Sequence, residues 1–294
     1  MYDMLIRKKA IKIQERLGMR LGVVDGTSSR PIVKNLSDVT VALNDLYRVG
    51  LRAFVLPKEL FEGIANHQDI YTTHYSNLLK IRDMAKKFNI ELSIRHDQLT
   101  DQPDDMLKTI ANVANIMDCR NYIINPSFYS KIMPPDQALR LAVYKINEMT
   151  THLRVKVKMG VEVTPMRNEV GSFDDIIDIV KRTHGTEPVI NWGHAHAREG
   201  GAYETQKDFN LAITKMRQSL GMEWMKRAYF IFSGVQYNRD GLVKYLPLRK
   251  SNMKLDYLIR EIMSYDMKGT LVIQDPEREN FIADMLEELA DMVR

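Results

Sequence analysis

Short apolar runs alternate with longer amphipathic stretches along the chain. The runs are rich in Val, Ile, Leu and Phe, as is typical of buried strands, and polar or turn-forming residues bound them. We predict eight strands, at residues 20–24, 51–56, 90–95, 121–125, 155–163, 188–191, 228–232 and 270–274. The pattern therefore repeats one strand-and-helix unit many times.

The stretches between and after these strands carry apolar residues at helical spacing. They predict helices at residues 37–49, 76–88, 104–117, 137–152, 173–183, 206–219, 255–265 and 278–293. Ser172 and Thr205 precede two of them, each with an aspartate three residues later, which suits a helix N-terminus. Gly50 follows the first helix, as expected of a helix C-terminus.

Eight strand-and-helix units favour a single (β/α)8 TIM-barrel domain over residues 20–294. No Ser-, Gly- or Pro-rich linker divides this range. The alternative is a doubly wound open sheet, which is disfavoured because neither GxGxxG nor GxxxxGK[ST] occurs. Residues 1–19 form a basic, amphipathic helical segment that could support a dimer or cap the barrel floor.

Composition narrows the class of protein. The chain has 294 residues, 45% of them hydrophobic, which is enough for a large core. The single cysteine, Cys119, excludes an intramolecular disulfide framework and favours a reducing, cytoplasmic location. No apolar run is long enough for a membrane span. The net charge of +4 slightly favours an anionic partner.

Hydrogen-bonding side chains stand at the predicted strand ends, which meet at one mouth of a TIM barrel. They are Asp25, Arg95, His96, Asn125, Glu162, Asn191, His194, His196, Ser233, Gln236, Gln274 and Asp275. Carboxylates and imidazoles are too few here for a multinuclear zinc site. Arg198 and the turn at residues 238–241 are expected in loops, where they could contact phosphate or only solvent.

Five motifs occur in the order found in endonuclease IV, the apurinic/apyrimidinic endonuclease family 2. They are Met159-Gly-Val-Glu-Val-Thr164, residues 191–198, Phe232-Ser-Gly-Val-Gln-Tyr237, Tyr245-Leu-Pro-Leu248 and Ile273-Gln-Asp-Pro276. Over residues 20–290 the chain resembles a divergent relative of that family, within the xylose-isomerase-like TIM barrels. The resemblance implies DNA repair chemistry, in which three zinc ions at the strand ends cut the backbone beside an abasic site.

Most of the implied zinc ligands are replaced. Carried over along the motifs, one family histidine falls on Arg95, or on the adjacent His96 after a one-residue slip, and another falls on Asn125. A family aspartate falls on Asn191 and a glutamate on Gln274. Further ligand positions fall on Ile231 and near Val243 and Tyr245, whereas Glu162 and His194 match. Amides lack the negative charge that binds a dication, and an arginine would repel one, so a three-zinc cluster is not expected.

The leading hypothesis is a barrel with a degraded metal site that binds DNA, another nucleic acid or a phosphorylated small molecule, with little or no catalysis. Its ligand-binding residues would be Arg95, Asn125, Asn191, Gln236 and Gln274, acting without a cofactor. Glu162 would be buried, with Arg95 as its expected partner across the mouth, either as a structural ion pair or as part of the ligand site.

The alternative is an enzyme that uses one zinc or manganese ion. His194 and His196 are two residues apart, so on an extended segment they would face the same side and could share a metal with Glu162. Glu162 would then be the catalytic residue of an AP endonuclease, a phosphodiesterase, or a sugar isomerase or epimerase. A structural or partner-binding role is the third hypothesis.

Overall fold

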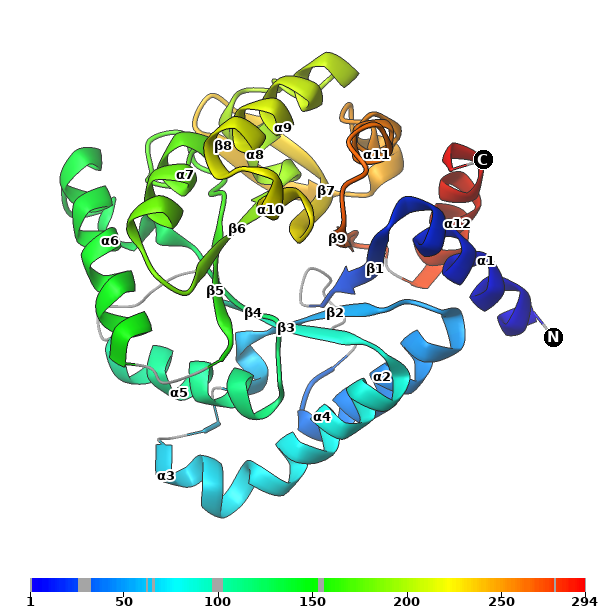
Figure 1. Ribbon diagram of the computed structural model, residues 1–294, viewed down its shortest axis with the longest axis horizontal. Helices are drawn as coiled ribbons and strands as arrows, with labels where there is room; N and C mark the ends of the chain where they lie inside the picture. Colours follow the sequence, from blue (N-terminus) through cyan, green and yellow to red (C-terminus); the bar gives the residue numbers. More distant parts are fainter. Residues whose placement is uncertain are drawn as a thin grey trace.

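The chain folds as a closed barrel of eight parallel strands surrounded by helices (Figure 1). The computed structural model describes residues 2–25, 33–61, 63–64, 67–96, 103–152, 156–277 and 279–293. The barrel strands are β1 (Met19–Val24), β2 (Ala53–Pro57), β3 (Glu91–His96), β4 (Asn121–Ile124), β5 (Lys158–Glu162), β6 (Thr186–Asn191), β7 (Ala228–Asn238) and β9 (Gly269–Gln274).

Neighbouring strands follow the order β6-β5-β4-β3-β2-β1-β9-β7, and β7 closes the ring by pairing with β6. This ring confirms the predicted TIM barrel and shows that the open-sheet alternative is wrong. All eight predicted strands are present. Their predicted ends differ by a few residues, because strand termini depend on pairing partners as well as on the apolar run itself.

Helices cover the outside of the ring (Figure 1). The long ones are α2 (Leu36–Val49), α4 (Tyr75–Phe88), α5 (Pro103–Ile116), α6 (Pro135–His152), α7 (Phe173–Arg182), α9 (Gln206–Leu220), α11 (Leu255–Ser264) and α12 (Glu279–Met292). Ser172 and Asp175 form the capping box that begins α7. Gly50 ends α2 with a positive φ of 84°, which glycine adopts without strain.

Short helical segments fill several connections. They are the 3-10 turns η1 (Lys58–Phe61), η3 (Pro126–Tyr129) and η4 (Leu248–Lys250), the π turn η2 (Ile70–His74), and the short helices α3 (His67–Asp69), α8 (Trp192–Arg198) and α10 (Met222–Met225). Of these, α8 matters most for the site, because it follows β6 directly at the mouth of the barrel.

The N-terminal segment is the helix α1 (Tyr2–Leu17), which lies in the outer layer between α2 and α12 (Figure 1). Its buried side is formed by Ala10, Ile13 and Leu17. The apolar side of α1 packs sideways against its neighbours in the helical ring.

Side chains fill the inside of the barrel in layers. The middle layer is apolar and consists of Val24, Val55, Ile123, Val189, Tyr229, Ile231 and Val272. At the N-terminal floor, Arg120 donates to Thr270 Oγ1 at 2.8 Å and to Glu187 Oε1 at 3.2 Å, with its guanidinium 5.1 Å from the centre of the Tyr229 ring. Arg120 and its partners therefore occupy the floor, and the opposite mouth is the end at which this fold places its functional residues.

A hairpin that the apolar pattern did not predict rises from the mouth. β7 continues beyond the barrel to Asn238 and pairs antiparallel with β8 (Gly241–Leu246). Within the described part of the chain, no helix is both long enough and apolar enough to cross a membrane.

Candidate functional site

A buried ion pair between Arg95 and Glu162 lies at the mouth of the barrel. Arg95 Nε donates to Glu162 Oε2 at 2.9 Å and Nη2 donates to Oε1 at 2.8 Å, so the contact is bidentate. The side chains are only 7% and 2% exposed, which shields the pair from solvent. The sequence-based prediction that Arg95 reaches Glu162 across the mouth is confirmed. Such a pair is costly to bury but strongly destabilising to break.

Two amides, at the ends of β6 and β9, add hydrogen bonds to this pair. Asn191 Nδ2 donates to Glu162 Oε1 at 2.8 Å, and its Oδ1 accepts the backbone N–H of His194 at 3.1 Å. Gln274 Oε1 accepts from Arg95 Nη1 at 3.3 Å. Both amides are fully buried. We call Arg95, Glu162, Asn191, His194 and Gln274 the mouth cluster.

The ring nitrogens of His194 are both engaged. Nδ1 lies 2.8 Å from the Val163 carbonyl, which can only accept, so Nδ1 carries the proton of the neutral ring. Nε2 then accepts from the Tyr245 hydroxyl at 2.8 Å and lies 3.4 Å from Arg95 Nη2. Tyr245, on β8, is therefore part of the site. The family resemblance was the one signal for it, because a ligand position falls near this residue.

His196 points away from the mouth cluster. It lies in α8, where residues two apart differ by about 200° around the helix axis, so the predicted extended segment is wrong. His196 Nδ1 accepts from the backbone N–H of Tyr203 at 3.1 Å, and Nε2 lies 3.0 Å from Asn252 Oδ1. Burial lowers the pKa of His196, although the Asn252 hydrogen bond opposes the shift.

Asn125 and Gln236 lie outside the mouth cluster. Asn125 is half-buried and uses Oδ1 to accept the backbone N–H of Ser127 at 2.9 Å, which begins η3. Gln236 is exposed on the extension of β7, opposite Lys244 of β8. Of the five predicted ligand-binding residues, the structure therefore brings together Arg95, Asn191 and Gln274.

Ser233, where β7 stops pairing with β9, and Asp275, directly after β9, stand beside the cluster. Ser233 pairs in register with Gln274 and is fully buried. Asp275 is also buried and accepts the backbone N–H groups of Leu248 and Glu277, both at 2.7 Å. Burial raises the pKa of Asp275. Asp275 therefore anchors the segment that follows β8 rather than reaching into the cluster.

The mouth cluster does not fit a divalent metal ion. Both oxygens of Glu162 are bonded to the Arg95 guanidinium, and His194 Nε2, the other candidate donor, is engaged by Tyr245. A dication placed among these donors would lie against a guanidinium and be repelled by it. Across the ranges that the structure describes, no group of three or more His, Cys, Asp or Glu side chains could hold a metal.

Arg198 holds the loop between β5 and α7 in place. It is only 7% exposed and donates from Nη1 to Thr164 Oγ1 at 2.9 Å and from Nη2 to the Glu169 carbonyl at 2.6 Å. The prediction of a solvated or phosphate-binding loop arginine is therefore wrong. The same loop bonds the hairpin tip, since the Arg167 N–H donates to the Asp240 carbonyl at 3.0 Å.

Exposed cations gather on the mouth-side hairpin and the turn that follows it. Residues 238–254 contain five basic residues and one acidic residue, a net charge of +4 that equals the net charge of the whole chain. The five are Arg239, Lys244, Arg249, Lys250 and Lys254, and all are exposed. Arg239 Nε lies 3.8 Å from Asp240 Oδ2, and Arg249 Nη2 lies 2.6 Å from Glu277 Oε1. The three lysines have no ion pair with any described residue. We call this segment the basic hairpin.

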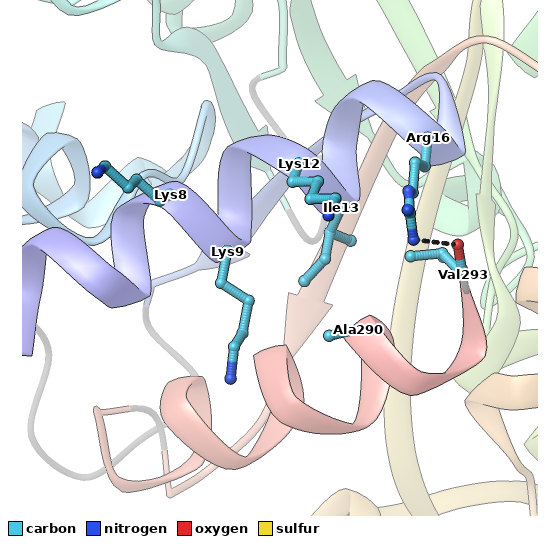
Figure 2. A pocket seen from close by; sticks show the side chains of 7 residues that line it. All are labelled: Lys8, Lys9, Lys12, Ile13, Arg16, Ala290 and Val293. Carbon is cyan, nitrogen blue, oxygen red and sulfur yellow. Dashed lines mark hydrogen bonds between the residues drawn. The ribbon is translucent and has the colours of Figure 1, made fainter.

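A second basic surface lies on α1. A cleft of about 440 Å³ lies between α1 and α12 (Figure 2). It is lined by Lys8, Lys9, Lys12, Ile13, Arg16, Ala290 and Val293. Lys9 pairs with Glu287, and Arg16 donates to the Val293 carbonyl at 3.2 Å. Figure 1 places α1 beside α12, well apart from β8. This surface therefore provides a comparison for the basic hairpin, away from the strand ends.

Solved structures with the same architecture include an epimerase and a nuclease. D-psicose 3-epimerase from Clostridium cellulolyticum superposes with a TM-score of 0.61 at 11% identity, covering 94% of this chain and 98% of that one. Endonuclease IV from Thermus thermophilus gives 0.61 at 14% identity, over 92% and 99%. The chain has the fold of the xylose-isomerase-like TIM barrels. At these identities the likeness concerns the fold alone.

The chain is similar to an uncharacterized protein, MJ0133, from Methanocaldococcus jannaschii, which is 23% identical over 272 residues that cover 87% of this chain and 93% of that protein. No protein-family model matches the sequence.

Proposed function

We propose that this chain is an endonuclease IV-related TIM barrel with a degraded metal site, and that it binds nucleic acid without cleaving it. The observation that carries the proposal is the basic hairpin, residues 238–254, which gathers a net charge of +4 beside the barrel mouth. Cations spaced along an exposed segment suit a phosphodiester backbone, because each can neutralise one phosphate and release its counterion.

A polymer fits these cations better than a phosphorylated small molecule does. The one arginine of the mouth cluster already holds Glu162 with two hydrogen bonds, so its charge is neutralised inside the barrel. Lys244, Lys250 and Lys254 are exposed and lack ion pairs with described residues, but they lie on an open hairpin and turn. A repeating polyanion presents one phosphate after another to cations spaced along such a segment, which a small molecule does not.

Absence of cleavage follows from the same cluster. Hydrolysis of a phosphodiester needs an activated water and stabilisation of the developing charge, which related chemistry obtains from metal ions. Here Glu162 and His194 are engaged by Arg95 and Tyr245, so neither side chain is available to activate a water. Binding without cleavage is therefore the expected behaviour.

The test compares two pairs of charge reversals in the full chain. Lys244→Glu with Lys250→Glu alters the basic hairpin, whereas Lys8→Glu with Lys12→Glu makes the same change of net charge on α1. Binding of a fluorescent oligonucleotide is measured by anisotropy in EDTA, at several salt concentrations. We expect the hairpin pair to weaken binding about tenfold and to lower the slope of log K against log[salt] by about 1.5, since two phosphate contacts are lost.

The α1 pair should change the affinity less than about twofold. Equal losses in the two variants would mean that only net charge matters and would contradict the proposal. Efficient cutting of abasic DNA by the EDTA-treated or zinc-treated chain would contradict the non-catalytic part. Binding of a sugar phosphate, but not of an oligonucleotide, would move the function to a small ligand.

A further inference from the structure

The Arg95 guanidinium is a cation with acceptors converging on it from several strand ends. Two carboxylate oxygens of Glu162 lie at 2.8 and 2.9 Å from its nitrogens, Gln274 Oε1 at 3.3 Å and His194 Nε2 at 3.4 Å. These oxygen and nitrogen acceptors come from the end of β5, the end of β9 and the helix after β6. A bound metal ion would draw on the same kinds of donor.

We propose that the Arg95 guanidinium is the resident cation of this barrel mouth, standing in for the divalent metal that the fold family implies. In this role it ties the ends of β5 and β9 to the helix after β6, so the mouth assembles without metal and excludes zinc as long as Arg95 is present. The inference concerns the buried interior and is independent of binding on the basic hairpin.

The charges of the neighbouring residues match a monovalent cation. Glu162 supplies one negative charge against one positive charge, while Asn191 and Gln274 contribute neutral amides that hydrogen-bond without adding charge. A dication in the same place would leave an uncompensated positive charge in a buried site. The two amides therefore suit a guanidinium, just as two carboxylates would suit a metal.

The His194–Tyr245 contact supports the same assignment. Nε2 of a neutral histidine can coordinate a metal or accept a hydrogen bond, and here it accepts from the Tyr245 hydroxyl at 2.8 Å. Tyr245 comes from β8, so the hairpin itself covers the imidazole nitrogen. Metal binding would require both this hydrogen bond and the Arg95–Glu162 pair to be broken.

The experiment asks whether Arg95 is what keeps zinc out. Three proteins are stripped with EDTA, exposed to zinc, freed of loosely bound ions and measured for zinc per chain and for melting temperature. They are the unaltered chain, the variant Asn191→Asp with Gln274→Glu, and the same variant with Arg95→His added. The second protein is the matched control, because it gains both carboxylates but keeps the guanidinium.

We expect less than about 0.1 zinc per chain in the first two proteins and about one in the third, with a zinc-dependent rise in melting temperature only there. Stoichiometric zinc in the unaltered chain, lost in His194→Ala, would overturn the proposal. So would equal zinc uptake by the second and third proteins, or a folded third protein without zinc. Should the third protein fail to fold, unfolding of the unaltered chain in EDTA would overturn the proposal, and full stability there would support it.

Discussion

The two histidines of α8 have different hydrogen-bond partners because they lie on different sides of the helix. His194 is held with its proton on Nδ1 by the Val163 carbonyl, whereas His196 accepts at Nδ1 from the Tyr203 N–H and so carries its proton on Nε2. They are two residues apart, yet His194 belongs to the mouth cluster, whereas His196 packs against Tyr237 with the two ring centres 5.1 Å apart. Identical side chains therefore have separate roles, which a sequence spacing of two does not reveal.

His196 predicts a pH dependence of stability. Because burial lowers its folded pKa below the ordinary 6.5, the unfolded chain binds more protons than the folded chain between these two pKa values. The stability that depends on neutral His196 is complete above pH 6.5 and is lost as the pH falls through this window. The slope from one such group is at most about 1.4 kcal/mol per pH unit.

Urea unfolding from pH 7.5 to 5.0 checks this expectation. His196→Gln should lose less stability on acidification than the unaltered chain, while His184→Gln, at an exposed position, should follow the unaltered chain. Asp275, whose pKa burial raises, acts in the opposite direction but is common to all three proteins, so it cancels from the differences. Parallel curves for His196→Gln and the unaltered chain would contradict the assignment.

Among the elements, α8 and the β7–β8 hairpin are joined through one loop. Arg198, at the end of α8, donates to Thr164 and Glu169 of the β5–α7 loop, and that loop bridges to the hairpin tip at Met166 and Gly241. Gly241 has φ of 130°, and a Cβ there would lie 2.2 Å from the Pro165 carbonyl oxygen. Only glycine permits this close approach. The hydrogen bonds of Arg198 hold in place the β5–α7 loop that Gly241 contacts.

Replacing Arg198 should therefore loosen the loop and the hairpin tip without opening the barrel. Arg198→Met keeps the apolar stem but removes its hydrogen bonds, so residues 163–171 and 239–242 should exchange amide hydrogens about tenfold faster or more. Hydrogen exchange followed by mass spectrometry measures this. Arg239→Met, which removes an exposed cation from the same tip, should leave the rates unchanged. Faster exchange spread over β1 and β9 would instead indicate general destabilisation.

The elements also show what the sequence could predict. All eight barrel strands were predictable, because each contains apolar residues whose side chains are buried in the barrel or under the helices. β8 was not, because Val243 and Lys244 are exposed and the strand is held by pairing with β7 rather than by burial. α8 was missed because its seven residues are too few to display a helical period.

One part of the site could be predicted from the sequence, because a buried charge needs a partner. A carboxylate at the end of β5 must have a partner, and Arg95 was the cation available at another strand end, so the pair followed from residue types alone. Tyr245 and Arg198 could not be placed in the same way. Their contacts depend on how the hairpin and the β5–α7 loop fold over the mouth, and no pattern within either segment encodes that arrangement.

At the scale of the whole molecule, the barrel holds charged groups at both ends and an apolar layer between them. The pair of Arg95 and Glu162 lies at the mouth. The pair of Arg120 and Glu187 lies at the floor, with Arg120 Nε 3.2 Å from Glu187 Oε1. Val55, Ile123, Val189 and the rest of the middle layer separate the two pairs. Groups that share no partner contribute independently to stability. We therefore expect the two ion pairs to contribute independently to the stability of the barrel.

Double-mutant cycles test this separation by urea unfolding. Arg95→Met should destabilise by about 3–5 kcal/mol, because it leaves the Glu162 charge buried and unpaired, and combining it with Arg120→Met should give the sum of the single effects within about 0.5 kcal/mol. Combining Arg95→Met with Glu162→Met should instead cost clearly less than the sum, because the second change removes the unpaired charge that the first created. A large coupling between Arg95 and Arg120 would mean that strain crosses the apolar layer, and that the mouth cluster cannot be altered without disturbing the floor.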